Sequence, residues 1–346
     1  MRPLFLVCAA AMCLAAPAVS LPAEGKSVKL NGYLEYRKAS FLVVEGQRVS
    51  TDEKTRFTGT GRAKSLDKTP MGYEMKVKGI RREDGTVLAR EIEAVPNRTG
   101  SSEQELLAAT DSVENAYVKA GKVYEQGQDG KELLIGKLHD SGPQVERARR
   151  IVGRVLPAYV PREKVSVYVV DNKEWNAMAM PNYSIYVFSQ LMADMDDDEV
   201  AIVLGHEIAH ATYEHSRRQQ KTGMIGGLAG AAAGLGASAI DNPLARQAVE
   251  MGASLGVTTF GNTFSREYED QADRVGLRYV YEAGYDYTKA PKLWRKFADK
   301  YGDQDKITNF FFGDHSTSVR RASDLEQQIA HNYADPKKDP PVNPGK

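Results

Sequence analysis

Two histidines and a glutamate stand at a spacing that could hold and use a metal ion. They are His206, Glu207 and His210, in an apolar run that begins at Val200. If this run is helical, positions four apart share one face, so both imidazoles can reach a single ion. Glu207 would lie beside that face, where a carboxylate can act as general base on a metal-activated water. The pattern predicts a site for metal-assisted hydrolysis.

The flanking residues favour a helix at this position. Residues 196–199 are acidic and offer a cap where the helix should begin, while Arg217, Arg218 and Lys221 add positive charge where it should end. The five-residue pattern also occurs by chance, and both histidines would then be hydrogen-bonded core residues. Buried histidines and carboxylates without partners are costly, so the apolar context favours a zinc helix with one Zn²⁺ per chain.

A catalytic zinc site needs a third protein ligand. His215 lies nine residues after His206, which puts it on the opposite side of a continuous helix. The HExxHxxGxxH pattern also fails, because Tyr213 and Ser216 stand at its glycine and third histidine. We therefore expect His215 to be an exposed or capping residue near the helix end.

A later acidic segment, residues 265–273, offers the missing ligand. Glu269 and Asp273 are one helical turn apart on one face. Glu269 could bind the metal while Asp273 accepts the free N–H of a ligating histidine. Taken alone, with Glu267 and Asp270 close by, this segment is typical of a charged helix surface. The upstream HExxH pattern reverses that interpretation.

Together, the segments HEIAH and SREYEDQAD resemble the gluzincin peptidase family that includes HtpX, BepA and the CAAX prenyl proteases. The resemblance covers roughly residues 104–333. It implies an α+β fold whose zinc metallopeptidase domain is mainly helical with a small sheet. It also implies that Glu269 is the third zinc ligand, and that Asp273 matches the family's aspartate four residues later.

An earlier segment extends the resemblance to substrate binding. Asn176 begins the sequence NAMAMP, which is similar to the family's NAFAxP segment. The apolar run that follows, residues 183–188, is predicted to be a strand, and the resemblance implies that it is a sheet edge beside the cleft. A peptide would then pair with the backbone of Ser184 or Ile185, which favours extended, unfolded substrates.

A late segment, HSTSVRR, resembles the family's HPxxxxR segment. The resemblance implies that His315 and Arg321 face the reacting carbonyl and stabilise its oxyanion. Ser316 replaces the usual proline, and the six-residue spacing selects Arg321 rather than Arg320. Without the family, a polar loop followed by a helix at residues 322–329 would be the simpler interpretation.

The first twenty residues are typical of an export signal. Arg2 precedes an uncharged apolar stretch at residues 4–16, and Ala18 and Ser20 frame a small-x-small cleavage site. Cys8 and Cys13 both lie inside the stretch, and neither follows the small residue that a lipoprotein site requires. We expect a cysteine-free mature protein in the periplasm.

The remaining segments suggest further units. Residues 27–96 contain short alternating runs separated by turns, which predicts a small all-β, OB-like module. We interpret this module as a docking site for a protein partner or as a spacer. Residues 97–103 are a predicted linker. Residues 143–156 predict an amphipathic helix, and 165–170 a core strand. The tail at 335–346 is predicted to be disordered.

Composition disfavours some classes of partner. With 46 basic and 46 acidic residues, the chain offers no electrostatic case for nucleic acid. Residues 222–240 are uncharged and long enough to span a membrane, but their glycine and alanine equally suit close packing or a flap, so membrane association is not favoured.

These features predict a secreted zinc endopeptidase for unfolded or misassembled envelope proteins, with a role in protein quality control. The alternative is a periplasmic chaperone or assembly factor whose metal site is latent, for instance because His315 binds zinc as a fourth ligand.

Overall fold

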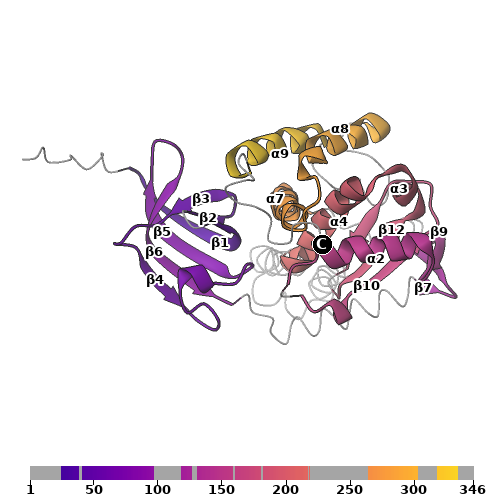
Figure 1. Ribbon diagram of the computed structural model, residues 1–346, viewed down its shortest axis with the longest axis horizontal. Helices are drawn as coiled ribbons and strands as arrows, with labels where there is room; N and C mark the ends of the chain where they lie inside the picture. The colour runs from indigo at the N-terminus through magenta and orange to yellow at the C-terminus, as the bar shows by residue number, and fades with distance from the viewer. Residues whose placement is uncertain are drawn as a thin grey trace, which may run out of the picture.

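The computed structural model describes residues 25–38, 41–96, 118–126, 131–158, 160–180, 182–216, 218, 264–302 and 318–333. An N-terminal unit of strands is followed by a unit that combines strands with helices, so the fold is α+β as predicted (Figure 1). His315 and the predicted signal, linker, uncharged run and tail lie outside the described residues.

The N-terminal unit is a sheet that closes on itself. Its strands are β1 (Ser27–Lys38), β2 (Phe41–Val44), β3 (Gln47–Ser50), β4 (Arg56–Gly59), β5 (Glu74–Arg81) and β6 (Val87–Val95), with a short 3-10 helix at Leu66–Lys68. The order is β3-β2-β1-β5-β6-β4, and β3 also pairs with β6 in parallel, which completes a barrel. The predicted alternation is confirmed in β5, where Met75 and Val77 are buried in the barrel's own core.

The second unit packs helices against another sheet. Its strands are β7 (Val118–Lys119), β8 (Lys122–Gln126), β9 (Glu132–His139), β10 (Ser166–Val170), β11 (Ala177–Ala179) and β12 (Ser184–Phe188). Its helices are α2 (Pro143–Val155), α3 (Ser189–Asp194), α4 (Asp197–Thr212), α7 (Arg266–Glu282), α8 (Ala290–Tyr301) and α9 (Ser318–Asn332), with 3-10 turns at Arg162–Lys164 and Tyr287–Lys289. The predicted α2 is confirmed, with its apolar face buried.

Helix α4 carries the HExxH pattern and begins as predicted. The Asp196 side chain accepts from the backbone N–H of Glu199, and the Glu199 side chain accepts from that of Asp196, which is a capping box. The helix is buried on nearly every side, as its apolar sequence demands. It ends at Thr212, short of the basic residues where we expected its end.

Helices α4 and α7 cross where each carries a glycine. A Cβ on Gly276 would lie 2.7 Å from the backbone nitrogen of His206, and a Cβ on Gly205 would lie 2.9 Å from the carbonyl oxygen of Gly276. Side chains would force the two backbones apart. The glycines therefore permit the close approach that lets carboxylates of α7 reach histidines of α4.

The expectation that residues 183–188 form a sheet edge is wrong. The sheet order is β11-β12-β10-β9-β8-β7, so β12 lies between β11 and β10. Ser184 and Ile185 pair with Ser166 and Val167 of β10 in parallel, and Ile185 also pairs with Ala179 of β11. Within the described residues the edge next to α4 is β11, the NAMAMP segment itself.

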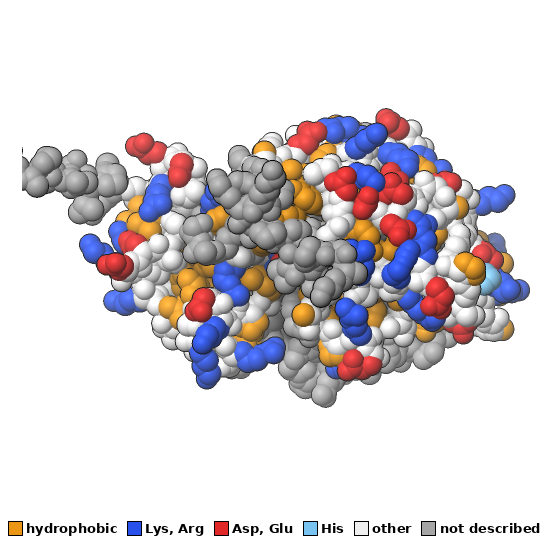
Figure 2. Space-filling view, viewed as in Figure 1, with side chains coloured by type: hydrophobic (Ala, Val, Ile, Leu, Met, Phe, Trp, Pro, Cys, Tyr) orange, Lys and Arg blue, Asp and Glu red, His pale blue; other side chains and the backbone are white. Residues whose placement is uncertain are grey.

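On the face shown in Figure 2, the described residues show no dominant sign of charge. Figure 2 shows lysine and arginine side chains interspersed with aspartate and glutamate on one face. This agrees with the balanced composition. Among the helices that the structure describes, none combines the length and apolar character needed to cross a membrane.

Candidate metal centre

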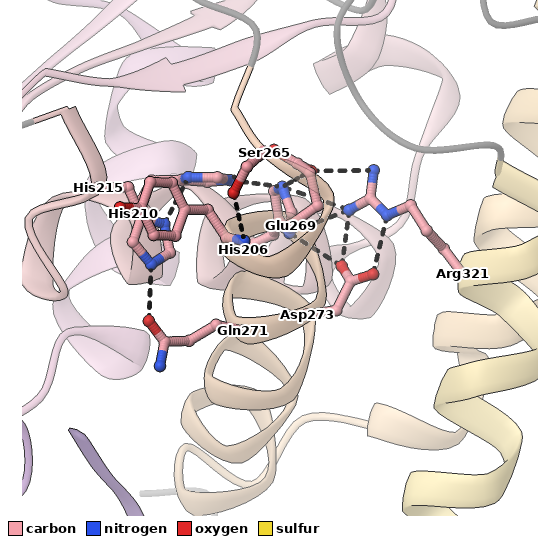
Figure 3. A network of polar contacts seen from close by, with 9 residues as sticks. His206, His210, His215, Ser265, Glu269, Gln271, Asp273 and Arg321 are labelled. Carbon is pink, nitrogen blue, oxygen red and sulfur yellow. Dashed lines mark hydrogen bonds and ion pairs between the residues drawn. The ribbon is translucent and has the colours of Figure 1, made fainter. Parts of the chain in front are cut away.

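Three buried donors converge from two helices. Nε2 of His206 lies 3.0 Å from Nε2 of His210, and the two atoms lie 3.4 and 3.3 Å from the carboxylate oxygens of Glu269. Within the described residues, these three side chains form a cluster of potential metal ligands (Figure 3). Zinc binds nitrogen and oxygen at about 2.0–2.2 Å, so its tetrahedral ligands stand roughly 3.3 Å apart. The donor set therefore fits a zinc ion.

The outer nitrogens of both histidines have partners of their own. Nδ1 of His206 lies 2.9 Å from Oδ1 of Asp273, whose carboxylate accepts its proton. Nδ1 of His210 lies 2.8 Å from Nδ1 of His215. With protons on the outer nitrogens, both Nε2 lone pairs face each other and the Glu269 carboxylate. Such a cluster of electron pairs attracts a shared cation, either a proton or a metal ion, and is therefore compatible with a metal site.

Asp273 connects the metal site to helix α9. Arg321 donates to Asp273 through Nε at 2.8 Å and Nη2 at 2.6 Å, and its guanidinium lies over the Trp294 ring at 3.7 Å. Burial acts to raise the pKa of Asp273, but the Arg321 charge and its hydrogen bonds hold that pKa below its ordinary value. Arg321 is only 2% exposed, and its guanidinium is directed at Asp273 rather than at solvent.

The surroundings of His206 favour positive charge. Burial and the nearby Arg321 act to lower the pKa of His206, but its contacts with Asp273 and Glu269 outweigh them and raise that pKa to about 9. Two buried carboxylates beside one imidazole stabilise a proton there. The same field would stabilise a divalent cation at Nε2.

The expectation for His215 is wrong, because the side chain is fully buried against the metal site. Glu214, with a φ of 55°, turns the chain sharply after α4, so the continuous helix that we assumed does not exist there. His215 is thereby brought back onto His210, and its Nε2 lies 2.9 Å from Oε1 of Gln271. Burial lowers the pKa of His215 to about 3, so the ring is neutral. A left-handed glutamate has no sequence signal.

Gln271 was missed by the sequence analysis. It is fully buried on α7, two residues after Glu269, and therefore does not share the face defined by Glu269 and Asp273. Figure 3 shows it pointing at His215 from the side opposite Arg321. No spacing rule links it to the motif, because its partners come from other elements.

The remaining predicted site residues lie as follows. Glu207 is half-buried on α4 beside His206, and its charge acts on Arg321. Asn176, Ser184 and Ile185 are buried. Arg320 and Arg321 both belong to α9, which begins earlier than residue 322, and Arg320 binds Asp270 and Asp324 at the helix surface rather than Asp273.

Two histidines of an HExxH helix and a glutamate of a second helix are the arrangement of zinc ligands found in a class of HExxH metallopeptidases. The chain belongs to Peptidase family M48, whose model matches residues 137–329. This confirms the resemblance inferred from the motifs. A second model, described as a domain of unknown function (DUF5666), matches residues 31–93 and so falls on the barrel.

Several named relatives match part of this chain. Mitochondrial metalloendopeptidase OMA1 of Bos taurus is 27% identical over 168 residues, which are 47% of this chain and 32% of the relative. The beta-barrel assembly-enhancing protease of Yersinia pestis is 26% identical over 237 residues, 62% of this chain and 47% of the relative. Metalloprotease LoiP of Escherichia coli is 27% identical over 188 residues, which are 54% of this chain and 71% of the relative. The chain thus spans about a third to a half of the first two relatives.

Proposed function

We propose that the protein is a zinc-dependent endopeptidase that hydrolyses unfolded or misassembled proteins. The observation that carries the proposal is the convergence of His206, His210 and Glu269, with Glu207 next to His206 on the same helix. Membership of Peptidase family M48 supports it. One zinc ion per chain would supply Lewis-acid activation of water at neutral pH.

The protein's own groups would divide the work as follows. Glu207 takes the proton of the attacking water and returns it to the leaving amine. Asp273 holds His206 in the tautomer whose Nε2 carries no proton, and Arg321 holds Asp273 in place. Stabilisation of the oxyanion by Arg321 and His315 stays a prediction from the resemblance.

Substrate would pair with the edge of β11 rather than with β12. Phe188 donates its backbone N–H to Asn176 at 2.9 Å, and Met180 donates to Ser184 at 2.8 Å. Because bonded residues alternate in an antiparallel pair, Ala177 and Ala179 turn their N–H and C=O groups away from β12. An extended peptide could add there beside α4, bound mainly through its backbone.

Ala179→Pro tests this mode of binding. Proline removes the outward N–H of an edge strand without breaking a bond to β12, so the fold should survive. We expect the KM for an unfolded substrate to rise about 2- to 10-fold, as for one lost hydrogen bond, with zinc content unchanged. Ala179→Ser keeps the N–H and is the matched control. Equal KM values for the two variants would refute pairing at Ala179.

We also propose that the protein works in the bacterial periplasm. The proposal is supported by residues 1–20, in which a basic residue is followed by an apolar stretch and then by small residues.

We propose further that the barrel is an OB-like module. The closure of its sheet by a parallel pair between β3 and β6 supports this.

The decisive experiment is cleavage of unfolded casein by the purified protein. We expect cleavage that a zinc chelator abolishes and that added zinc restores. Zinc binding without cleavage of casein or of envelope proteins would instead favour the latent chaperone or assembly factor.

A further inference from the structure

Strand β1 of the barrel packs against α7, the helix that carries Glu269 and Asp273 (Figure 1). The Tyr213 hydroxyl donates to the carbonyl of Leu34 in β1 at 2.9 Å. Tyr33 of β1 belongs to the hydrophobic core of the peptidase unit rather than to that of the barrel. At the C-terminal end of α9, Arg48 of β3 donates to Asn332 at 3.0 Å. The barrel is therefore joined to the peptidase unit by buried contacts.

Glu35 of β1 is the charged centre of this junction. It is 2% exposed, and Arg274 of α7 donates to both of its oxygens at 2.9 and 2.7 Å. Gln271 donates to it through Nε2 at 2.8 Å, and the backbone of Gly46 at 3.0 Å. Burial acts to raise the pKa of Glu35, but Arg274 and these hydrogen bonds hold that pKa below its ordinary value, so the group is a carboxylate.

A carboxylate can only accept hydrogen bonds, and this decides the orientation of Gln271. Its amide nitrogen must face the barrel, where Glu45 also accepts from it at 3.1 Å. Its oxygen then faces His215 Nε2 and Arg218, which donates to it at 2.6 Å. Because an amide oxygen can only accept, Nε2 of His215 must carry the proton.

The same logic continues to the metal ligand. Nδ1 of His215 lies 2.8 Å from Nδ1 of His210, so one of the two nitrogens must accept a hydrogen bond. When Nε2 of His210 binds a metal, its Nδ1 carries the proton, and His215, which has its proton on Nε2, accepts at Nδ1. His210 then has no proton on Nε2, the atom that faces His206 and Glu269. The direction of each hydrogen bond in this series follows from two fixed groups at Gln271, the acceptor Glu35 on the barrel and the donor Arg218.

We infer that Glu35 of the barrel is a positioning residue of the metal site. It acts on His210 through two intermediates, Gln271 and His215, and thereby holds the imidazole in its metal-binding tautomer. The barrel is thus a structural part of the metal centre, which extends the proposed function to the N-terminal domain. Without the Glu35 carboxylate, only Arg218 and the partly exposed Glu45 hold the Gln271 amide in this orientation. An amide that turns over presents N–H to His215, which reverses every later bond.

The test measures metal binding by the full chain with Glu35→Gln, which preserves shape but replaces a group that can only accept with an amide that can also donate. We expect the zinc dissociation constant, from competition with a chromophoric chelator, to rise about 10-fold. This is the lower end of the 10- to 100-fold range for groups that contact a ligand directly, since Glu45 still accepts from Gln271. The visible absorption bands of the Co²⁺-substituted protein should also shift, because the His210 ligand changes.

Arg48→Met is the matched control, because it weakens the contact between barrel and α9 but leaves the chain from Glu35 to His210 intact. Its Tm should fall while its zinc affinity and Co²⁺ spectrum stay as in the parent protein. Glu45→Gln, at a partly exposed residue, should raise the zinc dissociation constant less than Glu35→Gln.

The assignment of the pathway is tested in a Gln271→Ala background. If Glu35 acts through Gln271, adding Glu35→Gln there should change zinc affinity no further. Additive losses, or an unchanged Co²⁺ spectrum in Glu35→Gln, would overturn the inference. These readouts do not depend on proteolysis, so absence of casein cleavage with the expected metal effects would refute the proposed function alone.

Discussion

Glu207→Gln should leave the protein folded and loaded with zinc while slowing casein cleavage at least ~10²-fold. The carboxamide has nearly the shape of the carboxylate but cannot take a proton from water. Glu207 is half-buried on α4, and it is not one of the three converging donors. Metal content by mass spectrometry and kcat on the same preparation separate the two effects.

Glu146→Gln is the control for loss of a carboxylate elsewhere. Glu146 is exposed on α2, where it pairs with Arg149, so its substitution should alter neither kcat nor zinc content. A Glu207→Gln protein that cleaves casein at a rate comparable to the parent would contradict the proposed role of Glu207 as general base.

Glu269→Ala should lower zinc affinity by more than ~100-fold, because it removes a ligand rather than a group that orients one. Glu269 is fully buried, with its oxygens 3.3–3.4 Å from the two Nε2 atoms. Glu267, two positions earlier on α7, is exposed and points elsewhere. Glu267→Ala should therefore keep its zinc.

Equilibrium dialysis against a zinc buffer measures both variants directly. Equal affinities would show that another carboxylate is the third ligand. Glu269→Gln adds a variant with the original volume, so that a loss of metal cannot be ascribed to a cavity.

The arrangement within each helix could be predicted from the sequence. His206 and His210 share a face, and Glu269 and Asp273 share another, because the α-helix repeats every 3.6 residues wherever it forms. The cap at Asp196 and the buried face of α2 follow from equally local rules. Even the pairing of the two helices was inferred, since two half-sites for one metal must meet.

The tertiary structure decided which groups surround those motifs. The left-handed Glu214 ends the helical periodicity and buries His215, and strand order makes β11 rather than β12 the edge. Gln271 and Glu35 meet although 236 positions separate them. Periodicity along a chain specifies which side chains share a face, but the partner of a face is chosen by packing between distant segments, for which the spacing of residues carries no information.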